Sequence, residues 1–523
     1  MSLQKQTTCA KGAFRVKADD TQRLAERKAR IDDRLGGERQ WESERPIIES
    51  TNLRYEVSAR VQATALGGIG LVHEFVRHLG LAESLDRNVH VLKRHFPYHE
   101  SDHILTQTYN LMTGGTCIED IERLRQDQAY LDALGAERVP DPTTAGDFLR
   151  RFGKDALCGF VHAMDEVRPM VWARLPREER ELAIIDVDGT LAPTEGECKD
   201  GMGISYKGTW GYHPLLVTLA NTGEILSLAN RPGNETSHQG AAWYIDQAGD
   251  QALSGGFARV RYRGDTAFAL TEHFDRWDEE GAEFIFGFQA HEGLVAQADF
   301  LLERVWQPLK RRKKHKRKGP ARDRPENVKQ RIVKENGYTN YELEEEHITE
   351  FDYQPAACKK PYRMIALRKR IRVTQGQLRL ADDIRYFFYV TNAPKQRLSA
   401  QRVVFEANDR CDQENVIEQM KNGVHAMGVP SDNLESNWAW MLMGALAWNI
   451  KQWMGVSLPR TMRHEADEIG RMEFRRFLQS LIMLPCQLVR TARRTVLRIL
   501  SYSPWARVLI DGTEYFRNLR LRI

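Results

Sequence analysis

Three acidic residues stand where carboxylates could take part in chemistry. Asp188 closes a continuous apolar run, Leu182–Asp188, that predicts a buried strand. Asp265 directly follows a second strand-like run, Arg259–Arg263. Glu414 lies in a segment with helical periodicity. Because acids on separate elements can converge on one site, these three are the candidate catalytic residues.

The predicted helix from 408 to 421 places charges of both signs on one stripe. At 100° per residue, Glu414 and Lys421 lie at about 40° and about 20° from Arg410. A carboxylate between two cations suits a place where metal and phosphate meet. A surface ion-pair ladder is the alternative, since Arg410 and Glu414 are spaced i,i+4.

Residues 180–450 resemble the DDE transposases of bacterial insertion sequences, in the branch whose third acid lies in a Tyr-x2-Arg-x3-Glu-x6-Lys signature. Arg410, Glu414 and Lys421 match its spacing, whereas Ala407 replaces the Tyr. The first acid of the family lies in an Asp-x-Thr pattern, matched by Asp188-Gly-Thr190. The second lies in Gly-Asp-Ser-Gly-Phe, which the sequence Gly264-Asp-Thr-Ala-Phe268 follows loosely.

The resemblance implies an enzyme that binds transposon ends and catalyses metal-dependent DNA strand cleavage and strand transfer. Asp188, Asp265 and Glu414 would be ligands of two Mg²⁺ ions, for which Mn²⁺ can substitute. Arg410 and Lys421 would hold phosphate. The expected partners are double-stranded DNA, as terminal inverted repeats and as target, and a second copy of the chain in a homodimer on DNA. The expected route is cut-and-paste transposition, with hairpin DNA ends as one form of second-strand chemistry.

The element order predicts an α/β fold. Strand-like runs at 182–188, 212–220 and 224–229 are separated by turns and form a meander. A helix, a strand ending at 263, a helix and a strand at 283–287 follow. This order resembles an RNase H-like mixed sheet, interrupted by a β-rich insertion and flanked by helical N- and C-terminal regions.

The predicted domains follow these changes in pattern. They are a polar arm at 1–50, a helical DNA-binding or dimerisation region at 51–175, the first segment of the RNase H-like core at 180–300, a basic β-rich insertion at 301–384, the second segment of that core at 385–453 and a basic helical region at 454–523.

The charge of the chain is segregated. The total is only +4, yet residues 310–334 hold 13 Lys and Arg against 2 acids, and residues 451–523 hold 14 against 6. Such blocks are typical of nucleic-acid enzymes, although solvated surface is the alternative. The predicted DNA contacts in the first block are Lys310, Arg311, Arg312, Lys313 and Lys314, with Trp306 beside them as a candidate for stacking on a displaced base or as a core residue.

Two other functions remain open at this stage. Ile184-Ile-Asp-Val-Asp-Gly-Thr-Leu191 also resembles the signature of haloacid-dehalogenase-like phosphatases, in which Asp186 would be the nucleophile and Asp188 the acid/base. That family needs a second acid a few residues beyond Asp265, where Ala269 and Leu270 stand instead. A catalytically inactive DNA-binding relative is the other alternative.

A short predicted helix, Ala145–Phe152, ends in two arginines and could read DNA or simply connect helices.

Composition excludes several classes of protein. Seven scattered cysteines with no C-x-x-C pair argue against a disulfide framework or a zinc ribbon and fit a reducing compartment. The most apolar window, 438–448, is too short to cross a membrane, and residues 1–20 lack a signal-peptide core. The expected location is therefore the bacterial cytoplasm, in association with the nucleoid.

Overall fold

The computed structural model describes residues 18–36, 53–58, 60–196, 198–311, 328–375, 378–379, 382–491 and 494–518. A ten-stranded mixed sheet is its central feature. Its strands, in spatial order, are β10 (Gln307–Pro308), β11 (Thr339–Tyr353), β12 (Tyr362–Gln375), β14 (Asp383–Thr391), β9 (Glu283–Phe288), β8 (Val260–Gly264), β2 (Ala183–Gly189), β6 (Leu215–Leu219) and β7 (Glu224–Ala229), with β13 (Leu378–Arg379) paired to β12.

The RNase H-like core occupies one end of this sheet. β2, β6 and β7 form the predicted antiparallel meander, and β8 and β9 add to β2 in parallel. Parallel neighbours need a crossover connection. α9 (Ala241–Ser254) provides it before β8, and α10 (Thr271–Glu279) provides it before β9. The predicted mixed core is confirmed, and its meander differs from the doubly wound parallel sheet of the phosphatase alternative.

The two faces of β2 have different partners. Ile185 and Val187 belong to the hydrophobic core that contains Ile245 and Ala248 of α9. Since side chains alternate along a strand, Asp186 and Asp188 lie on the opposite face. That face is covered by α13 (Ala400–Asn408) and α14 (Cys411–Glu418). Both acids therefore point towards the two helices that follow the insertion.

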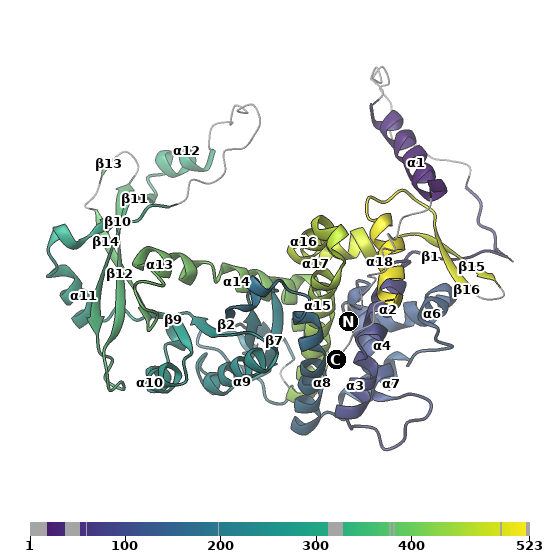
Figure 1. Ribbon diagram of the computed structural model, residues 1–523, viewed down its shortest axis with the longest axis horizontal. Helices are drawn as coiled ribbons and strands as arrows, with labels where there is room; N and C mark the ends of the chain where they lie inside the picture. The colour runs from purple at the N-terminus through teal and green to yellow at the C-terminus, as the bar shows by residue number, and fades with distance from the viewer. Residues whose placement is uncertain are drawn as a thin grey trace, which may run out of the picture.

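The insertion continues the core sheet and does not form a separate layer. β14 pairs antiparallel with β9, β12 pairs with β14, and the long β11–β12 hairpin extends the sheet to its far edge (Figure 1). The cations of β12 are largely matched by the acids of β11. Arg370 lies 3.8 Å from Glu345, and Arg372 is paired with Glu344. The hairpin is therefore less basic than the sequence of the insertion suggests.

The helical region lies beside the β7 edge of the sheet (Figure 1). α15 (Leu434–Ser457) is buried along almost its whole length and contacts α4, α8, α16 and β7. A helix that is apolar all round is a core helix. The helices of this region and its surroundings are α1 (Ala18–Gly36), α2 (Ile69–His78), α3 (Leu81–Asn88), α4 (Glu100–Met112), α5 (Ile121–Arg125), α6 (Gln128–Leu134), α7 (Pro142–Leu149), α8 (Lys154–Trp172), α16 (Arg463–Arg471), α17 (Phe474–Phe477) and α18 (Ala506–Asn518), while α11 (Glu292–Asp299) and α12 (Val328–Glu335) accompany the insertion.

The expectation of a wholly helical tail is wrong. β15 (Cys486–Thr491) and β16 (Arg494–Ile499) form a hairpin that pairs with β1 (Gln62–Thr64) near the other end of the chain. Alternate residues at the start of β15 are buried, as in a half-buried strand. Within the described ranges, no helix is long and apolar enough to cross a membrane.

Candidate active site

Two of the predicted acids lie at one edge of the sheet. β2 and β8 are parallel, and Val187 pairs with Gly264. Asp188 and Asp265 are the next residues, so their carboxylates leave the ends of adjacent strands side by side. Asp188 Oδ1 accepts a hydrogen bond from the Gly189 amide at 2.8 Å, and Asp265 Oδ1 accepts one from the Ala267 amide at 2.8 Å. Each carboxylate is thus oriented by a backbone amide one or two residues further along the sequence.

The electrostatics of Asp188 reflect this position. Burial is the largest cause of its raised pKa. The charge of Arg410 opposes the shift, and the charge of Asp265 adds to it. A carboxylate whose pKa is raised by burial and by a nearby like charge is stabilised in its charged form by a cation. The pair therefore has the chemistry of a cation ligand set.

Asp186 is committed to a different role. Its two carboxylate oxygens accept hydrogen bonds from Nε and Nη2 of Arg263, at 2.6 and 2.7 Å. Both residues are almost fully buried. Burial raises the pKa of Asp186, and the ion pair with Arg263 opposes that shift. An acid held in this way lacks the exposed, unengaged oxygen that a nucleophile needs, which disfavours the phosphatase alternative.

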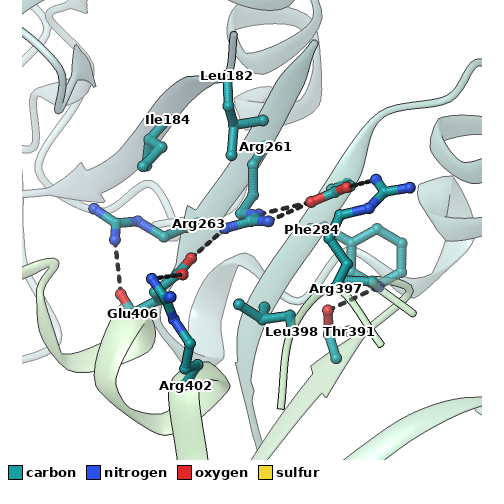
Figure 2. A network of polar contacts seen from close by, with 12 residues as sticks. Leu182, Ile184, Arg261, Arg263, Phe284, Thr391, Arg397, Leu398, Arg402 and Glu406 are labelled. Carbon is teal, nitrogen blue, oxygen red and sulfur yellow. Dashed lines mark hydrogen bonds and ion pairs between the residues drawn. The ribbon is translucent and has the colours of Figure 1, made fainter. Parts of the chain in front are cut away.

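Arginines of β8 also fix the helices that cover the site. Arg261 lies between Glu283 of β9 and Glu406 of α13, and its Nε donates to Glu283 Oε2 at 2.9 Å. Arg263 donates from Nη1 to the carbonyl oxygen of Glu406 at 2.8 Å. Figure 2 shows Arg261 and Arg263 meeting Glu406 of α13. Arg397 also forms an ion pair with Glu283. This network holds the end of α13 against β8.

α14 begins directly over the strand ends. Arg410, its N-cap residue, donates from Nη1 to Asp188 Oδ2 at 2.7 Å. Gln413 is buried, and its Nε2 donates to the carbonyl oxygens of Asp186 and Leu216 at 3.0 and 3.2 Å. Glu414 follows Arg410 by one turn and is exposed. The helix therefore carries its acid past the strand ends on an outward face.

The predicted helix from 408 to 421 is not continuous. α13 ends at Asn408, α14 ends at Glu418, and Gln419–Gly423 forms a π-helical turn. The 100° spacing consequently fails for Lys421, which lies in the π turn. Burial lowers the pKa of Lys421. π turns inside helices occur frequently at functional sites.

The donor set fits a divalent cation in part. Mg²⁺ prefers carboxylate oxygens, and Asp188 and Asp265 supply them from adjacent strands. Over the described ranges of the chain, however, no three His, Cys, Asp or Glu side chains form a group able to hold a metal ion. Glu414 therefore does not complete the set in this arrangement, and Arg410 is the group that contacts Asp188.

The remaining predicted residues lie on the insertion side. Trp306 is 6% exposed, and the Arg368 guanidinium covers its ring at 4.5 Å from the centroid. A base could stack there only after Arg368 moved. Arg311 is ion-paired with Glu346, and the carbonyl oxygen of Lys310 accepts a hydrogen bond from Gln401 at 3.2 Å. Arg312, Lys313 and Lys314 lie outside the described residues.

Two residues of the site were missed by the sequence patterns. Arg263 orients Asp186 and α13, and Gln413 joins α14 to β2. A signal for Arg263 exists in the sequence, since arginines alternate along the strand-like run Arg259-Val-Arg-Tyr-Arg263. A charge that recurs on one face of a buried strand implies an acidic partner. The sequence carries no comparable signal for Gln413.

The mixed sheet, with acids at the ends of its adjacent parallel strands β2 and β8, has the arrangement of an RNase H-like core. The family profile described as "Transposase DDE domain group 1" matches residues 52–521, and the chain belongs to this family. It is therefore a DDE-type DNA transposase, with the divalent-metal-dependent DNA cleavage and strand transfer of that family.

Comparison with solved structures gives a similarity to a piggyBac transposase synaptic complex with hairpin DNA. The match covers 79% of this chain and 88% of that chain, with 11% sequence identity and a TM-score of 0.33. Among curated proteins, none matches.

Proposed function

We propose that Asp188, Asp265 and Glu414 are the three acids with which this transposase cleaves and joins DNA at transposon ends. The observation that carries the proposal is the emergence of Asp188 and Asp265 from adjacent parallel strands, beneath the helix that bears Glu414. Asp186 is the less suitable first acid because Arg263 engages both of its oxygens.

Two Mg²⁺ ions bound by these acids would activate the attacking oxygen and stabilise the leaving oxygen. The residues of the chain then have separate tasks. Arg410 donates a hydrogen bond to Asp188, and it can exchange this partner for a DNA phosphate when the DNA strand binds. Lys421 is half-buried, and no ion-pair partner is found for it among the described residues, so it is available to a phosphate.

The first experiment compares cleavage with binding. Asp188→Asn, Asp265→Asn and Glu414→Gln should each abolish metal-dependent cleavage of DNA carrying the element's ends and leave end binding nearly unchanged. Asp412→Asn is the matched control, because it removes a carboxylate from the opposite face of α14. An equal loss of end binding in the three variants would show that the acids are structural. Cleavage surviving in any one of them would remove that acid from the catalytic set.

We also propose a homodimer that pairs two transposon ends and a cut-and-paste route with hairpin ends. Both are what the resemblance of residues 180–450 to DDE transposases implies. Light scattering of the protein with end DNA would measure the assembly, and denaturing electrophoresis of the cleavage products would detect covalently closed ends. A monomer on paired ends would refute the first proposal, and open ends alone would refute the second.

A further inference from the structure

A cavity lies in the helical region, away from the proposed catalytic acids. Its volume is about 460 Å³, within the range of about 300–1,000 Å³ that is usual for small-molecule sites. It lies between the segment that precedes α4 and the helix α7. α7 is the helix that the sequence offered either as a DNA reader or as a connector. Its residues Phe148 and Leu149 are buried, and Phe148 contributes to the wall of the cavity together with Thr144 and Asp147.

Aromatic rings line this cavity. His103 of α4 is 3% exposed, and its ring stacks on Phe148 with a centroid distance of 4.2 Å and an angle of 6°. Tyr98 lies edge-on to His103 at 5.5 Å. Phe96, at the rim, is 87% exposed. Planar rings at the wall and at the rim suit a planar, aromatic ligand.

His103 also presents an unsatisfied polar atom. Its Nδ1 is buried and has no hydrogen-bond partner. Burial, with the charge of Arg151, lowers the pKa of His103 to about 4, so the ring is neutral at physiological pH. A neutral imidazole nitrogen donates or accepts one hydrogen bond, according to its tautomer. Because this nitrogen is closed off from solvent, the neutral ring contributes an aromatic wall to the cavity and no charge.

The same cavity is lined by three cations, Lys93, Arg94 and Arg151. All three are exposed, and none has an ion-pair partner among the described residues. The one acid in the lining, Asp147, accepts from Arg150 at 3.2 Å. The rim therefore carries uncompensated positive charge, which suits phosphate.

We propose that this cavity binds an unpaired nucleotide of the DNA substrate. The base lies against Phe96 and Tyr98, beside the His103 ring, while Lys93, Arg94 and Arg151 hold the flanking phosphates. Duplex DNA offers phosphates but no free base, so the combination of aromatic rings and cations around one cavity favours a single-stranded or extruded nucleotide. The inference rests on the DNA transposase function and adds a site outside the catalytic acids.

The experiment measures binding of the full chain to two DNA probes by fluorescence anisotropy. One probe is a blunt duplex, and the other has the same duplex with a short single-stranded extension that contains 2-aminopurine. We expect the extended probe to bind about tenfold more tightly, and its 2-aminopurine fluorescence to be quenched by stacking. Phe96→Ala and Arg151→Ala should each remove most of that preference and leave blunt-duplex binding within about twofold.

Matched controls come from the same chain. Phe300→Ala removes another ring that is 88% exposed, and Arg150→Ala removes the neighbouring arginine, which is paired with Asp147. Both should keep the preference. His103→Phe keeps a ring stacked on Phe148 and removes only the buried Nδ1, so it should also keep the preference.

The outcomes separate the two claims. Equal affinity of the wild-type protein for the two probes, with duplex binding intact, would overturn the nucleotide site and leave the transposase function standing. Unchanged preference in Phe96→Ala and Arg151→Ala would also overturn it, and would place the single strand elsewhere. If the wild-type protein bound neither probe, the DNA transposase function itself would be refuted.

Discussion

Replacing Asp186 with Asn should destabilise the protein much more than replacing Asp188. The Asp186 carboxylate is 1% exposed and its partner Arg263 is 4% exposed. Removing one partner of a buried ion pair costs about 3–5 kcal/mol, because the other charge remains buried and unpaired. Asp188 and Arg410 are 18% and 15% exposed, so water can compensate part of the loss, and we expect a cost of about 1 kcal/mol for Asp188→Asn.

Denaturation by urea, followed by tryptophan fluorescence, would measure these costs, and cleavage would be assayed where both variants are folded. Folded Asp186→Asn should retain part of its cleavage activity, whereas Asp188→Asn should have none. A double variant, Asp186→Asn with Arg263→Gln, provides the control. It removes both charges of this pair and lets two amides hydrogen-bond, so it should recover most of the lost stability. A fully stable but inactive Asp186→Asn protein would refute the reasoning and make Asp186 the first catalytic acid.

Further predictions concern three other places. Burial lowers the pKa of Lys451 from the ordinary 10.5 to about 7. The unfolded chain then binds more protons between these values, and stability should rise with pH from 7 towards 10, by ~4 kcal/mol at most. Lys451→Met should flatten this rise in thermal melts; an unchanged rise would mean that another group causes it. Replacing the five cations at 310–314 with Gln should reduce the slope of log Kd against log salt concentration by up to about 4. The double variant Arg475→Gln with Arg476→Gln is the control for removing charge elsewhere on the chain. An unchanged slope would show that the 310–314 run is solvated surface and does not bind DNA phosphates. Glu224→Gln should cost about 3–5 kcal/mol in urea denaturation, because Glu224 faces Arg168 with both side chains fully buried; a cost below ~1 kcal/mol would show that the amide suffices.

The sequence predicted the sheet core well because its signals are local. Two runs in the sequence correspond to β2 (Ala183–Gly189) and β8 (Val260–Gly264). Each run shows the residue pattern of a strand and is followed by residues that end it. The position of Asp265 beside Asp188 followed from strand ends in a parallel pair, which the fold order implies. These features need no knowledge of distant partners.

The geometry after Glu414 could not be predicted in the same way. The helix changes to a π turn at Gln419, and the side chain of Gln419 accepts a hydrogen bond from the Phe474 amide at 2.8 Å. That partner is 55 residues further along the chain. The β15–β16 hairpin was missed for a related reason, because β15, the central strand of its sheet, pairs with β1 from the N-terminal part of the sequence. Both features depend on contacts that no local period records.

The acids around the candidate active site fall into two groups, according to whether an arginine of β8 forms an ion pair with them. Asp186, Glu283 and Glu406 are buried or half-buried, and arginines of β8 engage each of them. Asp265 and Glu414 have no ion-pair partner within the described part of the chain, and Asp188 has one, Arg410, that α14 supplies. Arginines that hold an acid permanently make it structural, whereas acids left without one are repelled from phosphate until a cation arrives. The arrangement of arginines therefore distinguishes the proposed metal ligands from their neighbours more sharply than the spacing of the acids does.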